Sequence, residues 1–162
     1  MFRISAEARA WRNKIIDSPG KAPIFNDEWD LYYLALLFGL TNSKKEINTE
    51  FCDMYKNFIK KYKDSKDVIM TLLIISHANR RELDLSKKEV LEEVLNYFYD
   101  SDGSESGLSA DAIKQMNYYA AGGFTIIEEL VPHYSNVNSG AAIELLHKNL
   151  KQSMDEFSKV TI

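Results

Sequence analysis

The sequence predicts an all-α protein: a single domain over residues 1–162, with about seven helices around an apolar central helix at 68–78. Only 3 prolines and 7 glycines interrupt the chain, which favours helices over a β fold with many turns. The hydrophobic fraction of 45% is typical of globular proteins and excludes a disordered chain. A chain of 162 residues holds one domain with a core and is too short for two ordinary ones.

The first half of the chain has four segments with apolar residues at helical spacing. We expect helices there, each begun by a common capping residue: Ser5 to the break at 17–20, Asn26 to Leu40, Asn48 or Thr49 to Tyr62, and Ser65 to Ala78. The fourth segment is apolar nearly all round, so its periodicity fits a buried strand as well as a helix. Its length and the cap favour a helix, which we expect at the centre of the core.

The second half begins with Ser86–Glu89, a capping-box pattern before an apolar helix that reaches Phe98. A polar loop is expected at 100–107. Leu108 and Ile113 flank the cap Ser109 as a hydrophobic staple. The helix that starts there is expected to run into a glycine pair, followed by a short helix to Leu130, a stop at Pro132 and a last helix from about Gly140.

The pair Gly122-Gly123 is the most informative local feature of the sequence. Glycine inside a helix costs roughly 1 kcal/mol relative to alanine. Because glycine has no Cβ, the pair permits either a turn of the chain or a close approach of another backbone. We expect it to serve one of these two purposes. A phosphate-binding role is disfavoured, since no lysine follows the pair and no strand precedes it.

The sequence favours a soluble, cytoplasmic protein. Cys52 is the single cysteine, so the chain forms no internal disulfide and fits a reducing compartment. No apolar run near residue 1 has the form of a signal peptide, and no stretch of 18 apolar residues could span a membrane. We therefore expect no membrane contact.

The sequence predicts no catalytic site, no metal and no cofactor. None of His77, His133 and His147 has a second histidine or cysteine three or four residues away, as paired zinc ligands usually do. The adjacent carboxylates, such as Glu128/Glu129, point to different sides of a helix and cannot share an acid–base site. No nucleophile motif is present, so we expect a protein that is not an enzyme.

The charge is unevenly distributed along the chain. Residues 1–88 hold 16 Lys and Arg against 12 Asp and Glu, and residues 89–162 hold 4 against 12. In the third predicted helix, Lys56, Lys60 and Lys63 fall on one face, and Arg80 and Arg81 form a second basic group. These five residues are predicted to contact the phosphates of nucleic acid, with double-stranded DNA as the candidate ligand. The alternative is that the lysines only solubilise an amphipathic helix.

Tyrosine and tryptophan pairs suggest contacts with a protein partner. We select Trp11, Tyr33, Tyr97 and Tyr118 as candidate partner-binding residues, because Tyr and Trp dominate interface hot spots. Adjacent tyrosines on a helix point about 100° apart, so one of each pair should leave the core. The alternative is a set of half-buried tyrosines with hydroxyls in water.

Two segments together resemble a known group of bacterial proteins. Phe25–Leu40 (FNDEWDLYYLALLFGL) and Tyr119–Ile127 (YAAGGFTII) resemble motifs of small proteins encoded with DNA-phosphorothioation (Dnd) systems, in the same order and spacing. Similar small helical subunits accompany SMC-type ATPases in three-component anti-phage systems such as Lamassu. The resemblance covers about a quarter of the chain and does not separate the two systems. It carries over no active residues.

The resemblance implies a non-catalytic accessory subunit of a bacterial anti-phage defence complex. Such a subunit would dock on a larger ATPase or nuclease and help to contact DNA. The charge distribution and the missing catalytic motifs agree with this function. Two alternatives stay open: a stand-alone nucleic-acid-binding module that uses a basic helix face, and a small enzyme without a recognisable motif.

Overall fold

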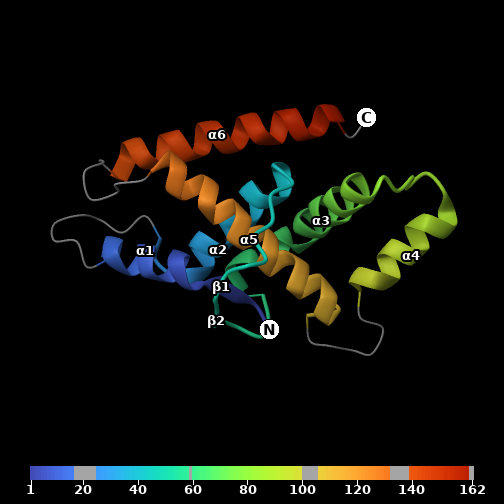
Figure 1. Ribbon diagram of the computed structural model, residues 1–162, viewed down its shortest axis with the longest axis horizontal. Helices are drawn as coiled ribbons and strands as arrows, with labels where there is room; N and C mark the ends of the chain where they lie inside the picture. Colours follow the sequence, from blue (N-terminus) through green and yellow to red (C-terminus); the bar gives the residue numbers. More distant parts are fainter. Residues whose placement is uncertain (17–24, 59, 100–105, 132–138, 161–162) are drawn as a thin grey trace.

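The computed structural model describes residues 1–16, 25–58, 60–99, 106–131 and 139–160 (Figure 1). The elements in these ranges are β1 (Arg3–Ser5), α1 (Ala6–Ile16), α2 (Glu28–Thr41), β2 (Phe51–Asp53), the 3₁₀ helix η1 (Lys60–Ser65), α3 (Lys66–Arg81), α4 (Lys88–Phe98), α5 (Ala110–Leu130) and α6 (Ser139–Val160). The predicted all-α class is confirmed in its coarse form, with one small antiparallel sheet added. The described part has six α-helices against about seven predicted.

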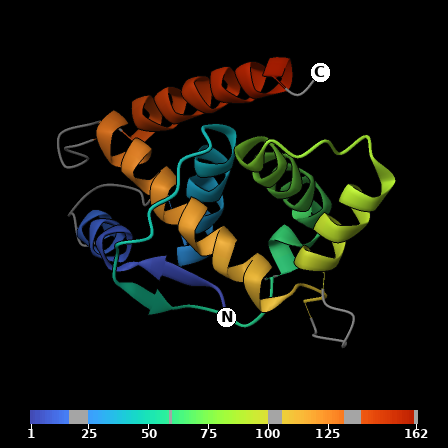
Figure 2. The ribbon, with the colours of Figure 1, turned by 45° about the vertical axis from the view of Figure 1, so that its right-hand side comes forward.

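The centre of the fold is the pair α2 and α5, which make the most extensive contact of any two elements. The sheet and α1 lie on one side of this pair, while α3 and α4 lie on the other (Figure 2). Trp29, Tyr32 and Leu36 of α2 are fully buried. The prediction of a central helix at 68–78 is therefore wrong in position: α3 is a helix, but it packs on one flank, and Val68 is 53% exposed.

The glycine pair lies inside α5, which is one continuous helix from Ala110 to Leu130. The expected break into two helices is thus wrong, and close packing is the alternative that holds. A Cβ on Gly123 would lie 1.8 Å from the carbonyl oxygen of Ala35 in α2. A Cβ on Gly122 would lie 2.3 Å from the carbonyl oxygen of Lys44, so the chain after α2 also passes against α5.

The third predicted helix, from Asn48 or Thr49 to Tyr62, does not form. Its first part is β2, which pairs antiparallel with β1 so that Ile4 lies opposite Cys52. Backbone bonds extend the pairing, from Phe2 N to the carbonyl oxygen of Tyr55 (2.9 Å). Apolar spacing in this segment reflects contacts with distant elements rather than a helical face, since tertiary pairing overrides local propensity.

The helix caps are partly as predicted. Ser5 Oγ accepts from Ala8 N (3.2 Å), and Ser109 Oγ accepts from Ala112 N (3.0 Å), which confirms both caps. Asp27 rather than Asn26 caps α2, in a capping box with Asp30. The remaining predictions for the helix ends are either wrong or outside the described residues. The predicted capping box at 86–89 is wrong, because the Ser86 hydroxyl donates to Asp84 instead. The predicted breaks at 17–20 and Pro132 and most of the loop at 100–107 lie outside the described residues.

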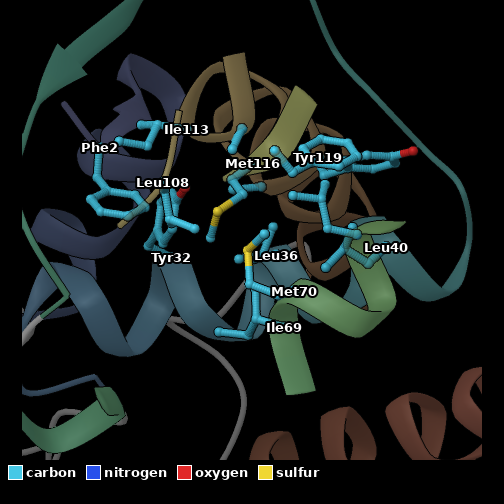
Figure 3. Packing of buried hydrophobic residues seen from close by; sticks show 14 of the residues in the cluster. Phe2, Tyr32, Leu36, Leu40, Ile69, Met70, Leu108, Ile113, Met116 and Tyr119 are labelled. Atoms are coloured by element: carbon cyan, nitrogen blue, oxygen red, sulfur yellow. The ribbon is translucent and has the colours of Figure 1, made fainter. Parts of the chain in front are cut away.

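The main apolar cluster fills the space between α2, α3, α4 and α5 (Figure 3). Met70 of α3 and Met116 of α5 meet Leu36 of α2 in its middle. Tyr119 lies at the edge of this cluster, with its hydroxyl pointing away from the other labelled side chains (Figure 3). A membrane-spanning helix is not present in the described part, where no helix is sufficiently long and apolar.

Candidate functional site

A cavity of about 300 Å³ lies between the C-terminal end of α3, the middle of α5 and the chain that follows α2. We call it the basic cavity, because Lys45, Arg80 and Arg81 line it together with His77. The half-buried rings of Tyr97 and Tyr118 form the apolar part of its wall, with Gln115 and Ile47 completing it. No Asp or Glu of the described ranges lines this cavity, although the whole chain has more acids than bases.

The position of Lys45 follows from the glycine pair. After α2 ends, the chain is held against the two central helices by bonds from Lys44 N to Gly39 O (2.9 Å) and from Glu46 N to Tyr118 O (3.0 Å). The missing Cβ of Gly122 makes this close approach possible, since that Cβ would lie 2.9 Å from the Cα of Lys45. Lys45 is therefore fixed between two backbone anchors, with its side chain against α5.

The Lys45 ammonium group lies among neutral and cationic groups. Its Nζ is 4.4 Å from the centroid of the Tyr119 ring and donates to Gln115 Oε1 (2.5 Å). Burial lowers the pKa of Lys45 to about 8, and the positive charges of Arg80 and Arg81 act in the same direction. By contrast, Lys61 donates to the Asp30 carboxylate (2.5 Å) and Lys44 to that of Glu129 (3.4 Å). Within the described ranges, Lys45 has no carboxylate partner.

Two further polar groups lie beside these cations. His77 packs 5.3 Å from the Tyr97 ring, and burial together with Arg81 and Lys45 lowers its pKa, so the imidazole is neutral at pH 7. The Tyr119 hydroxyl is buried and lacks a hydrogen-bond partner in the described part of the chain. Burial raises the pKa of Tyr119 to about 12, which keeps the hydroxyl a potential donor at neutral pH.

A second cavity, of about 340 Å³, adjoins the basic cavity and shares Ile47 and Tyr118 with it. We call it the aromatic cavity, because the half-buried rings of Phe51 and Tyr118 line it, 6.0 Å apart. Lys114 and Arg3 are its charged residues. Arg3 is paired with Asp53 (2.8 Å), whereas the Lys114 ammonium lies 5.9 Å from the Tyr118 ring centroid. Both cavities lie along the same helix, α5.

The five predicted nucleic-acid contacts fall into two separate places. Arg80 and Arg81 line the basic cavity, whereas Lys60 and Lys63 line another cavity of about 410 Å³ near the start of α3. The helix of 16 residues between them is about 24 Å long. Lys56 is exposed on the segment before η1. The expected α-helical face of Lys56, Lys60 and Lys63 does not exist, because that stretch is irregular chain and a 3₁₀ turn.

The four candidate partner-binding aromatics also separate. Tyr97 and Tyr118 line the basic cavity and are half-buried. Trp11 packs 5.8 Å from the Phe124 ring, and Tyr33 stacks on Tyr62 at 4.4 Å, so these two make contacts inside the molecule. In each adjacent pair one ring is less buried than the other: Tyr32 and Tyr119 are fully buried, while Tyr33 and Tyr118 are half-buried. Tyr33 still packs against the core, so it does not leave it as expected.

Sequence reasoning did not select Lys45, Gln115 or Tyr119. Lys45 follows a helix end in a short polar stretch, and its neighbour Lys44 looks identical in sequence. Only the crossing of α2 and α5 distinguishes the two lysines, since it directs one toward Glu129 and the other toward Gln115. A paired glycine in α5 was the available signal for a close backbone approach, but it does not say which segment approaches.

The histidines and the cysteine do not gather at one place among the described residues. In the ranges that the structure describes, no group of three or more His, Cys, Asp or Glu side chains could hold a metal ion together. His147 is exposed on α6, and His133 lies outside the described residues. Cys52 is a free, half-buried cysteine on β2.

The chain matches no model of a protein family, no curated protein and no solved structure. The two motifs of the Dnd and Lamassu resemblance fall on α2 and α5, the helices that cross at the glycines. They are packing segments of the fold. Membership of a defence system stays a prediction from the sequence.

Proposed function

We propose that the protein is a non-catalytic module that binds nucleic acid, with phosphate groups of the ligand held in the basic cavity. The observation that carries this proposal is the half-buried Lys45, placed beside Arg80 and Arg81 with no carboxylate partner among the described residues. Perturbed charges of this kind in a cavity are typical of functional sites. A bound anion would supply the missing negative charge.

The groups in the basic cavity suit a phosphate diester. Arginine presents a planar fork of donors that matches phosphate oxygens, and lysine adds a compact positive charge. The Tyr119 ring packs under the Lys45 ammonium, 4.4 Å from ring centroid to Nζ, and supports its position at the cavity wall. Phosphate contacts of this type position a nucleic acid without reading its sequence. We therefore expect binding that depends strongly on salt and weakly on sequence.

The test compares three triple variants by the fluorescence anisotropy of a labelled oligonucleotide at low salt. Replacing Lys45, Arg80 and Arg81 by Gln should abolish binding, because the cavity loses all three cations. The second triple, Lys56→Gln, Lys60→Gln and Lys63→Gln, removes the same charge from the cluster that the sequence predicted. The third, on Lys148, Lys151 and Lys159, removes it from the exposed face of α6. Both should bind like the unaltered protein.

For the unaltered protein, the logarithm of the binding constant should fall with the logarithm of salt with a slope of about −2 to −3, as expected for three cations on phosphates. No binding at low salt, or equal weakening by all three triples, would refute the proposal. If the second triple alone weakened binding, the nucleic acid would bind at the other end of α3 and not in the basic cavity. The predicted role as an accessory subunit of a defence complex stays a prediction beside this proposal.

A further inference from the structure

We infer that the nucleic acid bound by this protein is single-stranded, with an unpaired base stacked on Tyr118 in the aromatic cavity. This inference rests on the proposed function, since it needs the backbone of the ligand to lie in the basic cavity. It adds a second set of contacts, from rings to bases, and so commits to one structural form of nucleic acid.

The first step is the place of Tyr118. Its ring lines both cavities, so a ligand that fills one of them meets the same ring as a ligand that fills the other. The ring is half-buried and contacts Phe51 of β2 at 6.0 Å between centroids, with the planes tilted by 51°. This contact supports Tyr118 from one side. Its remaining exposed surface faces the cavities, where a flat base can lie against it.

The second step is the distribution of cations around Tyr118. Lys114 precedes Tyr118 by one turn of α5, lies 5.9 Å from its ring centroid and lines the aromatic cavity. The other cavity that Tyr118 lines holds Lys45, from the chain after α2, and Arg80 and Arg81, from α3. Cations from three parts of the fold therefore line the two cavities that share the Tyr118 ring. Proteins that bind single strands combine a positively charged track for the backbone with aromatic rings for the bases in this way.

The third step is the accessibility of the base faces. In a duplex both faces of each base are covered by the neighbouring base pairs, so a ring on the protein cannot stack on them without disrupting the helix. An unpaired base offers a free face, and stacking on an aromatic side chain is then favourable for any base. The aromatic cavity consequently favours single strands over duplexes while leaving sequence preference weak.

The test measures three ligands with the same protein: a labelled single-stranded 20-mer, the duplex of the same sequence, and tripolyphosphate as a competitor without bases. The single strand should bind at least about tenfold more tightly than the duplex, in line with the stacking of one base. Tripolyphosphate should displace the single strand only weakly. Equal affinity for both forms, or displacement by tripolyphosphate as effective as by unlabelled single strand, would overturn the inference.

Variants at Tyr118 separate stacking from folding. Tyr118→Leu should weaken binding of the single strand about tenfold and binding of the duplex much less, whereas Tyr118→Phe should keep full affinity because the ring remains. Tyr55→Leu is the matched control, an exposed tyrosine outside both cavities that should change neither affinity. Thermal melts of all three variants show whether each is folded.

The outcomes distinguish the two proposals. If no oligonucleotide binds at low salt, both proposals fail. If both forms bind equally and Tyr118→Leu has no effect, the phosphate site stands and the single-strand inference fails. Loss of binding in Tyr118→Phe as well as in Tyr118→Leu would also contradict stacking, since it would assign the effect to the hydroxyl.

Discussion

Gly39 of α2 and Gly123 of α5 face each other so closely that a Cβ on Gly123 would lie 2.5 Å from the Gly39 backbone nitrogen. A Cβ on Gly39 would in turn lie 1.9 Å from the carbonyl oxygen of Tyr119. The two helices therefore touch backbone to backbone, which is the geometry that small residues permit. This crossing lies within the most extensive contact between any two elements of the fold.

Gly123→Ala should destabilise the protein. Helix propensity alone would favour alanine by about 1 kcal/mol, but the new methyl group would meet the backbone of α2. Overpacking of this kind costs typically 1–3 kcal/mol or more, so we expect a net loss of about 2 kcal/mol in the free energy of unfolding. Urea titration measures it. Glu128→Ala, at an exposed position of the same helix, is the control and should change stability by less than about 0.5 kcal/mol. Equal stability of both variants would contradict the crossing.

Gly122→Ala should affect binding more than stability. Its methyl group would meet the carbonyl oxygen of Lys44, in a chain segment between elements rather than in a helix. That segment can shift at lower cost than α2, but the shift would displace Lys45 from the basic cavity. We expect weaker binding of the single-stranded 20-mer in a variant that melts close to the unaltered protein. A variant with unchanged affinity would show that the position of Lys45 does not depend on this glycine.

Nucleic-acid affinity should fall as pH rises from 7 to 9.5. The pKa of Lys45 in the free protein is about 8, and a bound phosphate would raise it, so binding takes up a proton in this range. We expect about a tenfold decrease, the value of one charge-assisted contact.

The neighbouring groups keep their charge in this range. His77 is already neutral, because its pKa is lowered, and Tyr119 titrates only near its pKa of about 12. Lys45→Arg provides the control, since its affinity should be constant between pH 7 and 9.5. A similar decrease in this variant would mean that another group titrates.

Asn117 joins α5 to α2 and to β1 with the residues just before it. Its Oδ1 accepts from the Tyr32 hydroxyl (3.0 Å) and from Arg3 N (3.0 Å), and its Nδ2 donates to Met1 O (3.3 Å). Asn117→Leu should cost about 2–3 kcal/mol, because a fully buried tyrosine hydroxyl loses its acceptor. Adding Tyr32→Phe to the Asn117→Leu variant should lower the free energy of unfolding by less than Tyr32→Phe does in the unaltered protein. A double-mutant cycle measures the difference, and additive losses would exclude the coupling.

The sequence predicted well what depends on neighbouring residues. The helices that contain Leu36, Leu73 and Ile113 have local apolar periodicity, and the predicted caps at Ser5 and Ser109 are present at the starts of α1 and α5. Prediction from the sequence failed where a segment pairs with an element that is distant in the chain. The strand Phe51–Asp53 exists because β1 lies beside it, almost fifty residues earlier in the chain, and a helical pattern of Phe51, Met54 and Tyr55 cannot show that.

The candidate site was predictable only in part, for a related reason. Arg80, Arg81, Tyr97 and Tyr118 were selected for charge and residue type, yet for two different roles. Their common place depends on the crossing of α2 and α5, which also brings in Lys45. In the sequence, Lys60 and Lys63 look equally suitable for phosphate contacts, but they lie at the other end of α3. Three-dimensional proximity, not residue type, separates the two groups.

The bond between Arg3 N and Asn117 Oδ1 spans 114 positions of the chain, and this separation has a consequence for biosynthesis. A ribosome makes the residues of β1 well before those of α5. β1 can pair with β2 once residue 53 has emerged, but it gains its anchor on α5 much later. β1 thus leaves the ribosome well before the helix that fixes its final position.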